Sequence, residues 1–513
     1  MTSDVLTRNP ASPSVASWER LDVRLIPVNL SLLAAPSASF VGTLLINGRL
    51  GLQALITLGS ILITFLAVTG FGLMRFLTTR YRLTDERIEL RSGLLFRSER
   101  ALSLDRVRSV DVTANPLHRV FRLTSVRIGT GEQITSSGRR LTLDGVGRAR
   151  AAELRREILS RRNTTAGRPV TDDDGPIATM DWAWVRYGPL TIWGVGGLLA
   201  AIGTTYRTLH EMRVDPLRLG FVKDIERHYG SVPLWFGVPA ALLAVVVVGA
   251  IGSTVALIEG WNGYCLERGA GGVISIHRGL LGTRSVTIDE RRLSGVEHRE
   301  PMLLRWAGGA RENAVAGGLG DREENRRRRL LTPPMPRAEA LAVAAAMFPE
   351  GESPLSMAGF RTHPRAALRR RITRGLALTA PVVAALAVLG WWLCTSFLYA
   401  AGICGLVLVP GAVALAFGAY RALGHGLHGR YLVTRAGVFA RSTVALKRTD
   451  IVGWSISRSI FQRRAGLLTL GAATAAGENC YKVRDVAVSD GLAFAEEAVP
   501  DLLAPFLERR RSA

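Results

Sequence analysis

Long stretches without a charged side chain constrain this sequence more than any other feature. Residues 27–46, 52–74, 188–205, 232–258 and 375–420 contain no Asp, Glu, Lys or Arg. A helix that crosses a bilayer needs about 20 apolar residues, and the last stretch is long enough for two such helices. Since 48% of the 513 residues are hydrophobic, a membrane protein is also the class that composition favours. We therefore expect six transmembrane helices arranged as three hairpins.

Arginines gather at the ends of these hairpins. The net charge is +23, and nearly all of the excess is arginine. Six arginines lie between residues 361 and 374, before the third hairpin, and Arg421 and Arg430 follow it. Arginines also flank the first hairpin on both sides, and an even number of spans gives the second the same orientation. Because basic flanks remain in the cytoplasm, we expect a multi-pass protein of the bacterial cell membrane with cytoplasmic termini.

The N-terminal segment does not look like a cleaved leader. It lacks the short basic start and the immediate apolar core of a secretory signal. We expect the first span to remain as an anchor.

A segment dense in arginine follows each hairpin, and the three segments resemble one another. The first begins YRLTDERIEL at Tyr81 and the third YLVTRAGVFA at Tyr431, which matches these two tyrosines. Further on, NPLHRVFRLTSV and SIFQRRAGLLTL align without a gap. The second segment, from Tyr264, is less regular but keeps the tyrosine and an RGLL turn. The sequence thus predicts a hairpin followed by a domain, repeated three times.

Apolar and polar residues alternate within each segment. In the first, Ile88 and Leu90 form one such pair, and Val110 and Val112 form another. This period of two predicts half-buried antiparallel strands. Each segment ends in an amphipathic helix, which in the first covers GVGRARAAELRREILSRR. We expect a curved antiparallel sheet closed by one C-terminal helix.

These motifs resemble the YdbS/YdbT-type bacterial pleckstrin-homology (PH) membrane proteins. The resemblance implies PH-like domains at a membrane and supplies no catalytic residue. Two departures stand out: Arg122 lies where the third copy has Gly466, and Glu267 replaces a threonine. The residues that carry the resemblance are Tyr81, Leu83 and Thr84; Arg91, Gly93 and Leu94; Leu104, Arg106, Val107 and Val110; and Leu143, Asp144 and Gly145.

The fold expected for the whole chain is therefore a mixture of membrane α and β structure. Six transmembrane helices in three hairpins are each followed by a PH-like antiparallel β-domain with a C-terminal helix. The predicted order is hairpin 18–79, PH-like domain 80–162, linker 163–180, hairpin 181–261, a divergent PH-like domain 262–349, linker 350–362, hairpin 363–427 and PH-like domain 428–510.

The sequence offers no catalytic or cofactor motif. It contains no GxxxxGK[ST], HExxH or GxSxG pattern, and its four cysteines lack metal-site spacing. His425 and His428 could share a face, but without a third ligand we interpret them as solvated histidines beside the membrane. We expect no enzyme activity, no cofactor and no metal.

The predicted function is that of an integral membrane scaffold or adaptor. Its PH-like domains would bind lipid headgroups, each other or an envelope-associated protein, and a homo-oligomer is a further expectation. No nucleic-acid module is present. A component of a transport or export system is the alternative, which the absence of ionisable residues in the apolar stretches disfavours.

Exposed arginines on the β-domains are the candidate lipid or partner contacts. Near an anionic leaflet each basic residue contributes about 1 kcal/mol. A solvated surface, rich in arginine because of genome composition, is the other interpretation. The candidates are Arg97, Arg100, Arg106 and Arg108 in the first copy and Arg458, Arg463 and Arg464 in the third.

Overall fold

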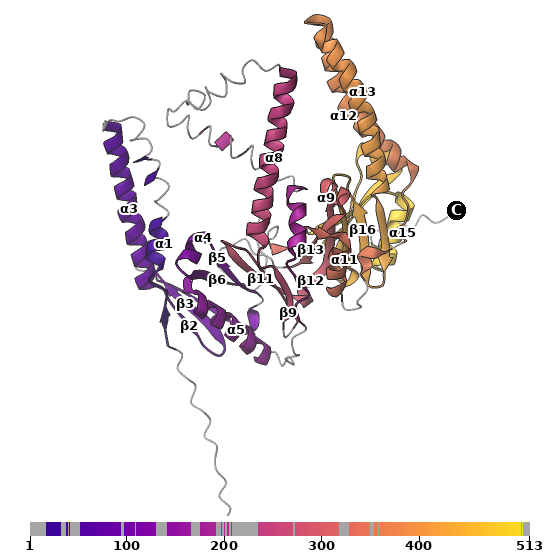
Figure 1. The fold of residues 1–513 in the computed structure, drawn as a ribbon. Coiled ribbons are helices and arrows are strands. Elements are labelled where there is room, and N and C mark those ends of the chain that lie inside the picture. Colours follow the sequence, from indigo (N-terminus) through magenta and orange to yellow (C-terminus); the bar gives the residue numbers. More distant parts are fainter. Residues whose placement is uncertain are drawn as a thin grey trace, which may run out of the picture. The chain divides into compact units, whose positions relative to one another are not determined.

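The chain forms two compact units in a computed structural model (Figure 1). Unit 1 comprises Met1–Asp173 and Gly269–Thr287, and unit 2 comprises Asp174–Arg268 and Ile288–Ala513. The structure describes residues 17–31, 52–93, 97–107, 109–129, 141–165, 175–190, 234–269, 272–317, 328–348, 353–357 and 359–503, with a few isolated positions between them.

Two antiparallel sheets and a C-terminal helix build the first repeat, in unit 1. The first sheet has the strand order β1-β2-β3-β4, and the second joins β7, β6 and β5 to β11 and β10 of the second repeat. The bounds are β1 Glu19–Arg20, β2 Arg80–Leu83, β3 Arg87–Ser92, β4 Ser98–Ser103, β5 Ser109–Ala114, β6 Leu123–Gly129, β7 Leu141–Gly147, β10 Val273–Arg278 and β11 Thr283–Asp289; the helices are α1 Leu25–Ser31, α3 Leu52–Thr78, α4 Pro116–Val120 and α5 Arg148–Thr165.

The apolar faces of these elements meet in one core. Ile88 of β3, Val126 of β6 and Leu154 of α5 are all fully buried in it. Alternation along the strands and the helical spacing of Ala151, Leu154 and Ile158 place these side chains on the inner faces. The predicted sheet closed by a C-terminal helix is therefore present.

Unit 2 holds most of the second repeat and all of the third. Its sheets have the orders β14-β13-β12-β17-β16-β15 and β18-β19-β20, and β8 pairs with β9. The strands are β8 Ala178–Thr179, β9 Cys265–Gly269, β12 Leu293–Pro301, β13 Gly309–Ala316, β14 Met335–Pro336, β15 Gly424–His428, β16 Tyr431–Ala436, β17 Ala440–Lys447, β18 Ile451–Ser457, β19 Leu467–Thr474 and β20 Cys480–Ala487; the helices are α8 Leu234–Trp261, α9 Met302–Trp306, α11 Arg337–Ala346, α12 Arg365–Trp392, α13 Ser396–Arg421, α14 Ile460–Arg464 and α15 Val488–Ala498, with a 3₁₀ helix η2 at Trp182–Leu190.

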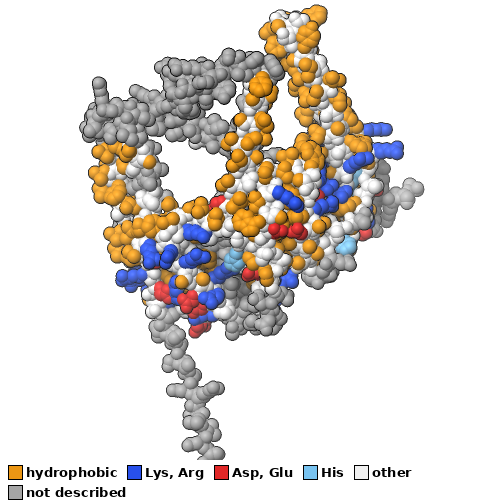
Figure 2. All heavy atoms as spheres, viewed as in Figure 1, with side chains coloured by type: hydrophobic (Ala, Val, Ile, Leu, Met, Phe, Trp, Pro, Cys, Tyr) orange, Lys and Arg blue, Asp and Glu red, His pale blue; other side chains and the backbone are white. Residues whose placement is uncertain are grey.

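Four helices in the described part of the chain are long and apolar enough to cross a membrane. They cover Leu58–Thr78, Leu242–Trp261, Arg365–Trp392 and Ser396–Arg421, and the last two form a hairpin. Hydrophobic side chains cover these helices, whereas charged side chains gather on the β-domains (Figure 2). The other two predicted spans, 27–46 and 188–205, lie mostly outside the described residues, so the count of six stays a prediction.

Each predicted membrane segment lies between two paired segments of its PH-like domain rather than before that domain. Strand β1 precedes the first span and pairs with β2, which follows the hairpin. Likewise β8 pairs with β9, and Arg361 forms a β-bridge with His425. The sequence pattern places these three short segments in the first predicted hairpin and in the two predicted linkers, because one or two residues are too few for a detectable alternation.

Side chains fasten β1 to its domain. Glu19 accepts hydrogen bonds from the Tyr81 hydroxyl at 2.6 Å and from Arg150 Nε at 3.0 Å. Burial and the hydrogen bond to Glu19 raise the pKa of Tyr81. The neighbouring Trp18 ring stacks against the guanidinium groups of Arg82 and Arg91. The two ends of the first hairpin are thereby held at one place on the domain.

The match between Tyr81 and Tyr431 is wrong by one strand. The left-handed turn glycines Gly93 and Gly437 fix the correspondence of β3 with β16. Tyr81 lies on β2, whose counterpart β15 carries His425 at that position. Adjacent strands have similar alternating patterns, so the tyrosines could be aligned without a gap in the wrong register. The alignment of Arg119 with Arg463 and of Leu123 with Leu467 agrees with the structure.

A left-handed backbone position ends the short helix of every repeat. Gly308 and Gly466 occupy it with φ of 73° and 64°, and Arg122 occupies it in the first repeat with φ of 56°. A residue with a Cβ atom costs about 1–2 kcal/mol in this region, whereas glycine adopts it freely. Arg122 is therefore a site of backbone strain.

We predict that Arg122→Gly stabilises the first repeat. Relief of the strain, offset in part by the greater chain entropy of glycine, should raise the free energy of unfolding by about 0.5–1 kcal/mol. Thermal or denaturant unfolding of the purified protein measures the change. Arg122→Ala removes the same side chain but keeps the Cβ atom, so equal stabilisation by both variants would contradict the backbone explanation.

Candidate functional site

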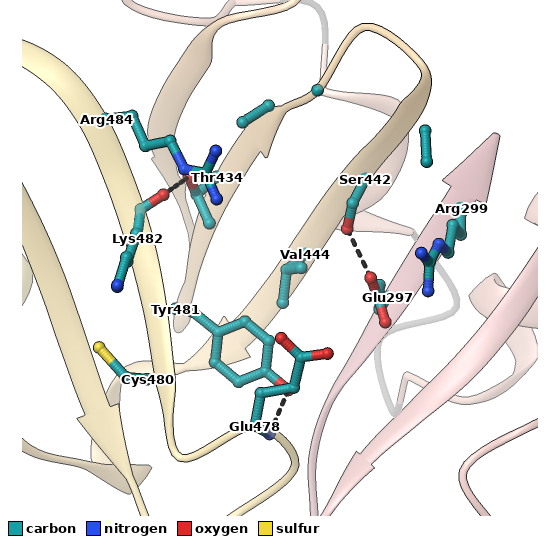
Figure 3. A pocket seen from close by; sticks show the side chains of 13 residues that line it. Glu297, Arg299, Thr434, Ser442, Val444, Glu478, Cys480, Tyr481, Lys482 and Arg484 are labelled. Carbon is teal, nitrogen blue, oxygen red and sulfur yellow. Dashed lines mark hydrogen bonds between the residues drawn. The ribbon is translucent and has the colours of Figure 1, made fainter. Parts of the chain in front are cut away.

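A cleft of about 500 Å³ opens between the second and third repeats, within unit 2 (Figure 3). Antiparallel pairing of β12 with β17 creates it, because this pairing joins the two domains through one continuous sheet. Residues of β12, β16, β17 and β20 line its walls. Figure 3 shows Lys482 and Arg484 on one side and Glu297 and Arg299 on the other.

The two carboxylates that line the cleft already have partners. Glu297 accepts hydrogen bonds from Ser442 Oγ at 2.7 Å and from Asn313 Nδ2 at 3.0 Å. Glu478 pairs with Arg329 at 2.8 Å. Neutral donors thus orient Glu297, which also lies 3.9 Å from Arg329, whereas the charge of Glu478 is paired with Arg329.

Three cations of the cleft have no such partner. Within the described ranges, Arg299, Lys482 and Arg484 form no salt bridge with a carboxylate, although each lines the cleft. Lys482 and Arg484 alternate with the buried Tyr481 and Val483 along β20, so strand geometry directs both outward. Arginine and lysine so placed suit a phosphate-bearing or carboxylate ligand.

The cleft lies near the foot of the third hairpin. Asp485, the residue after Arg484, bonds to Arg371 Nη2 at 3.0 Å and also pairs with Arg370. Both arginines belong to the first two turns of α12. A ligand held by Arg484 would thus approach the end of a membrane span.

A buried polar network locks the junction beneath the cleft. His298 Nδ1 lies 2.6 Å from Glu312 Oε1, while its Nε2 lies 3.8 Å from Glu300 Oε1, an ion-pair distance too long for a hydrogen bond. Glu300 accepts from Arg441 Nε at 2.6 Å, across the β12–β17 pairing. Burial lowers the pKa of His298, but its two carboxylate neighbours outweigh this effect and raise it to about 9.

This network is structural. His298, Glu300 and Glu312 expose 3%, 2% and 0% of their surface, so no substrate reaches them. In the described part of the chain, no three His, Cys, Asp or Glu side chains are placed to hold a metal ion.

His425 is buried, so its interpretation as a solvated histidine is wrong. It is 1% exposed and packs edge-on against His363 and Phe494, each with ring centroids 4.8 Å from its own. Burial, then the neighbouring His363 and Arg361, lower the pKa of His425 to about 4. Its position on β15 directs the His425 side chain inward, whereas His428 is half-buried. The sequence could not show this before β15 was identified as a strand.

The arginines chosen from the sequence do not form one patch. Arg97, Arg100 and Arg106 are exposed, but Arg97 and Arg100 are three positions apart near or on β4 and so face opposite sides of the sheet. Arg108 lies outside the described residues. Arg458, Arg463 and Arg464 are exposed around α14. The cleft cations went unnoticed because they are far apart in sequence and meet only through the β12–β17 junction.

Comparison with known proteins supports the PH-like assignment. The bacterial PH domain family model matches residues 34–162 and 375–498, which hold the first and third repeats. The UPF0699 transmembrane protein YdbT of Bacillus subtilis (strain 168) is 21% identical over 450 residues, which cover 85% of this chain and 87% of the relative. No solved structure gave a significant match.

We predict that the second repeat loses stability in alkali through His298, whose carboxylate neighbours Glu300 and Glu312 lie on β12 and β13 of that repeat. Its pKa is raised on folding, so its stabilisation is complete below the unfolded value near 6.5 and is lost as the pH rises through about 9. The loss should be on the order of 1–3 kcal/mol between pH 7 and pH 10. Unfolding midpoints across this range measure it. His298→Gln should flatten the pH dependence, and an unchanged slope in that variant would contradict the assignment.

Proposed function

We propose that this chain, whose first and third repeats belong to the bacterial PH domain family, is a non-enzymatic membrane scaffold that holds anionic lipid headgroups against its own membrane. The observation that carries the proposal is the set of three cations in the cleft, Arg299, Lys482 and Arg484, that form no salt bridge with any described residue. A headgroup phosphate supplies the missing negative charge and hydrogen-bond acceptors.

The short helix of each repeat supports contact with the bilayer surface. α4 packs against α1, α9 packs against η2, and Ser459 at the start of α14 lies 3.5 Å from Arg370 of α12. Each short helix therefore lies beside a segment that leads into the membrane. Large apolar side chains are nevertheless exposed there: Val120 by 76%, Trp306 by 71%, and Ile460 and Phe461 by 68% each.

Exposed apolar groups flanked by arginines suit the headgroup region. An arginine occupies the same place in all three short helices, as Arg119, Arg305 and Arg463. The apolar side chains can enter the boundary between headgroups and acyl chains while nearby arginines contact phosphates. This arrangement would hold each domain flat on the leaflet and keep the cleft at headgroup level.

The cytoplasmic leaflet is the one we assign. Arginines crowd the first turns of α12 beside the β-domains, whereas Trp391 and Trp392, at the opposite end, are 83% and 82% exposed. Basic residues favour the cytoplasmic end, and tryptophans favour a membrane interface. The four described spans carry ionisable residues only near their ends, which supports anchoring over the alternative of transport.

We predict that loss of the cleft cations abolishes headgroup binding. Full-length protein in neutral detergent should bind soluble dioctanoyl phosphatidylglycerol more tightly than dioctanoyl phosphatidylcholine, and added salt should weaken that binding by screening. The triple variant Arg299→Gln, Lys482→Gln and Arg484→Gln should lose about tenfold or more in affinity, because hydrogen bonds between charged groups are removed. Calorimetric titration measures both effects.

A matched triple variant is the control. Arg97→Gln, Arg100→Gln and Arg106→Gln removes the same charge from exposed positions outside the cleft. It should leave affinity for the soluble lipid within about twofold. Loss of binding in this control, with binding intact in the cleft variant, would transfer the headgroup site to the first repeat.

We predict that the turn between α12 and α13 is reached from outside the cell. Cys394 is exposed in this turn, and a membrane-impermeant maleimide added to intact cells should label it when it is the single cysteine left in the chain. Ser160→Cys or Ser489→Cys, introduced instead on the β-domains, should react only after cell lysis. Labelling of either before lysis would reverse the assigned orientation.

A further inference from the structure

The repeats are joined by strand pairing, and each junction uses the same two edges. In unit 1, β5 from the second sheet of the first repeat pairs with β11 of the second repeat. In unit 2, β12 from the second sheet of the second repeat pairs with β17 of the third. We call the edge that a repeat presents to the next repeat its outgoing edge, and it belongs to the strand before the short helix. The edge that receives it is the incoming edge of the next repeat, and it belongs to the strand after the turn glycine.

The two junctions also share one register. Ala114 lies opposite Thr283 in the first junction, and Glu300 lies opposite Arg441 in the second. Ala114 and Glu300 each stand two residues before their short helix, α4 or α9. Thr283 and Arg441 each stand four residues after a left-handed turn glycine, Gly279 or Gly437. The junction is therefore a repeated mode of association with a defined geometry.

One outgoing and one incoming edge are left over. β18 of the third repeat is the counterpart of β5 and β12, and β4 of the first repeat is the counterpart of β11 and β17. In the described part of the chain, both strands end their sheets and no strand pairs with their outer edges. An unpaired edge displays backbone N–H and C=O groups that can pair with another chain.

The outgoing edge β18 also exposes apolar side chains. Val452, at the β-bulge between Ile451 and Gly453, is 68% exposed, and Ile456 farther along the strand is 43% exposed. Trp454 Nε1 is buried and forms no hydrogen bond with any residue that the structure describes. The counterparts of Trp454 in the formed junctions are Val110 and Val296, and both are fully buried. The surface of β18 resembles a junction without its partner.

We infer that β18 of one molecule pairs with β4 of a second copy of this chain, antiparallel and in the register of the internal junctions. That register places Ser457 opposite Ser98 and Trp454 opposite Ala101. An alanine already fills the equivalent place in the formed junction, where Ala445 lies opposite Val296. This inference does not depend on headgroup binding.

A second copy is the occupant because its β4 is the incoming edge that remains free. Head-to-tail contact of this kind gives a closed ring when the rotation between successive copies returns to the first copy, and an open filament when it does not. Shared anchoring in one membrane brings the edges together at high effective concentration. Arg97 and Arg458 would face each other where Glu300 and Arg441 form an ion pair, so this contact is weaker than the internal one.

Register-specific cross-linking tests the inference. In full-length protein with its four native cysteines replaced by alanine, one tagged population carries Ser98→Cys and a differently tagged one carries Ser457→Cys. Cα atoms that face each other in an antiparallel pair lie within disulfide range. Mild oxidation of the two populations in mixed membranes should join the two tags. Ser489→Cys, an exposed position away from β18, replaces Ser457→Cys in the collision control.

The yield of the cross-link between the two tagged populations either supports or contradicts the pairing of β18 with β4. Cross-linking of Ser98→Cys with Ser457→Cys at least about fivefold above the collision control would support the pairing. Equal yields in the two experiments would overturn it. A chain carrying both substitutions provides a further check at one molecule per micelle, where a disulfide formed within the chain would overturn the assignment to a second copy.

A charge reversal tests the register independently. Arg97 is 72% exposed, so Arg97→Glu should leave the fold intact while placing a carboxylate opposite Arg458. The population of dimers and larger species, measured by mass photometry, should rise about twofold to fivefold. Arg106→Glu makes the same charge change at an exposed position outside the pairing and should have no effect. An equal response to both variants would contradict the register.

Discussion

Backbone hydrogen bonding across strand edges is the constraint on which the rest of this structure depends. A small sheet leaves a row of N–H and C=O groups at each edge, and these groups need partners. Here the edge of one repeat is completed by the next, through β5 with β11 and β12 with β17. Within each unit, strand pairing rather than a linker alone joins parts of neighbouring repeats. The cleft exists because this pairing sets Arg299 of one domain across from Lys482 and Arg484 of the other.

The second constraint is the insertion of each membrane segment between two paired strands. A domain that simply followed a hairpin would be attached at one point and could swing on its linker. Pairing before and after the hairpin attaches it at two points, and the contacts of Glu19 with Tyr81 and Arg150 tighten that attachment in the first repeat. Under the proposed function, such attachment would keep one face of each domain toward the bilayer, the face that carries the exposed apolar residues of α4, α9 and α14.

Features that repeat over many residues could be predicted from the sequence, whereas features made by a few residues could not. Charge-free stretches predicted the four described helices that are long and apolar enough to span a membrane, and the alternation at Ile88 and Leu90 predicted a strand that the structure contains. Strand β1 has two residues and leaves no periodic signal. His425 is buried because it lies on β15. The match of Tyr81 with Tyr431 aligned β2 with β16 instead of with β15, so this strand was not recognised. Arg299 and Arg484 converge only through tertiary pairing, which a local pattern does not encode.

The difference between internal and terminal edges explains how one chain could hold a fixed core and still associate reversibly. Inside the chain, Glu300 pairs with Arg441 across the β12–β17 junction, so opening that junction would break a buried ion pair. At the ends, Arg97 and Arg458 would meet as like charges at the same place in the register, which disfavours pairing in free solution. Confinement to one leaflet raises the local concentration of the two edges, and anions near the membrane surface would screen the repulsion. Association of β18 with β4 would then depend on how many copies share a patch of membrane, while the internal junctions stay closed throughout.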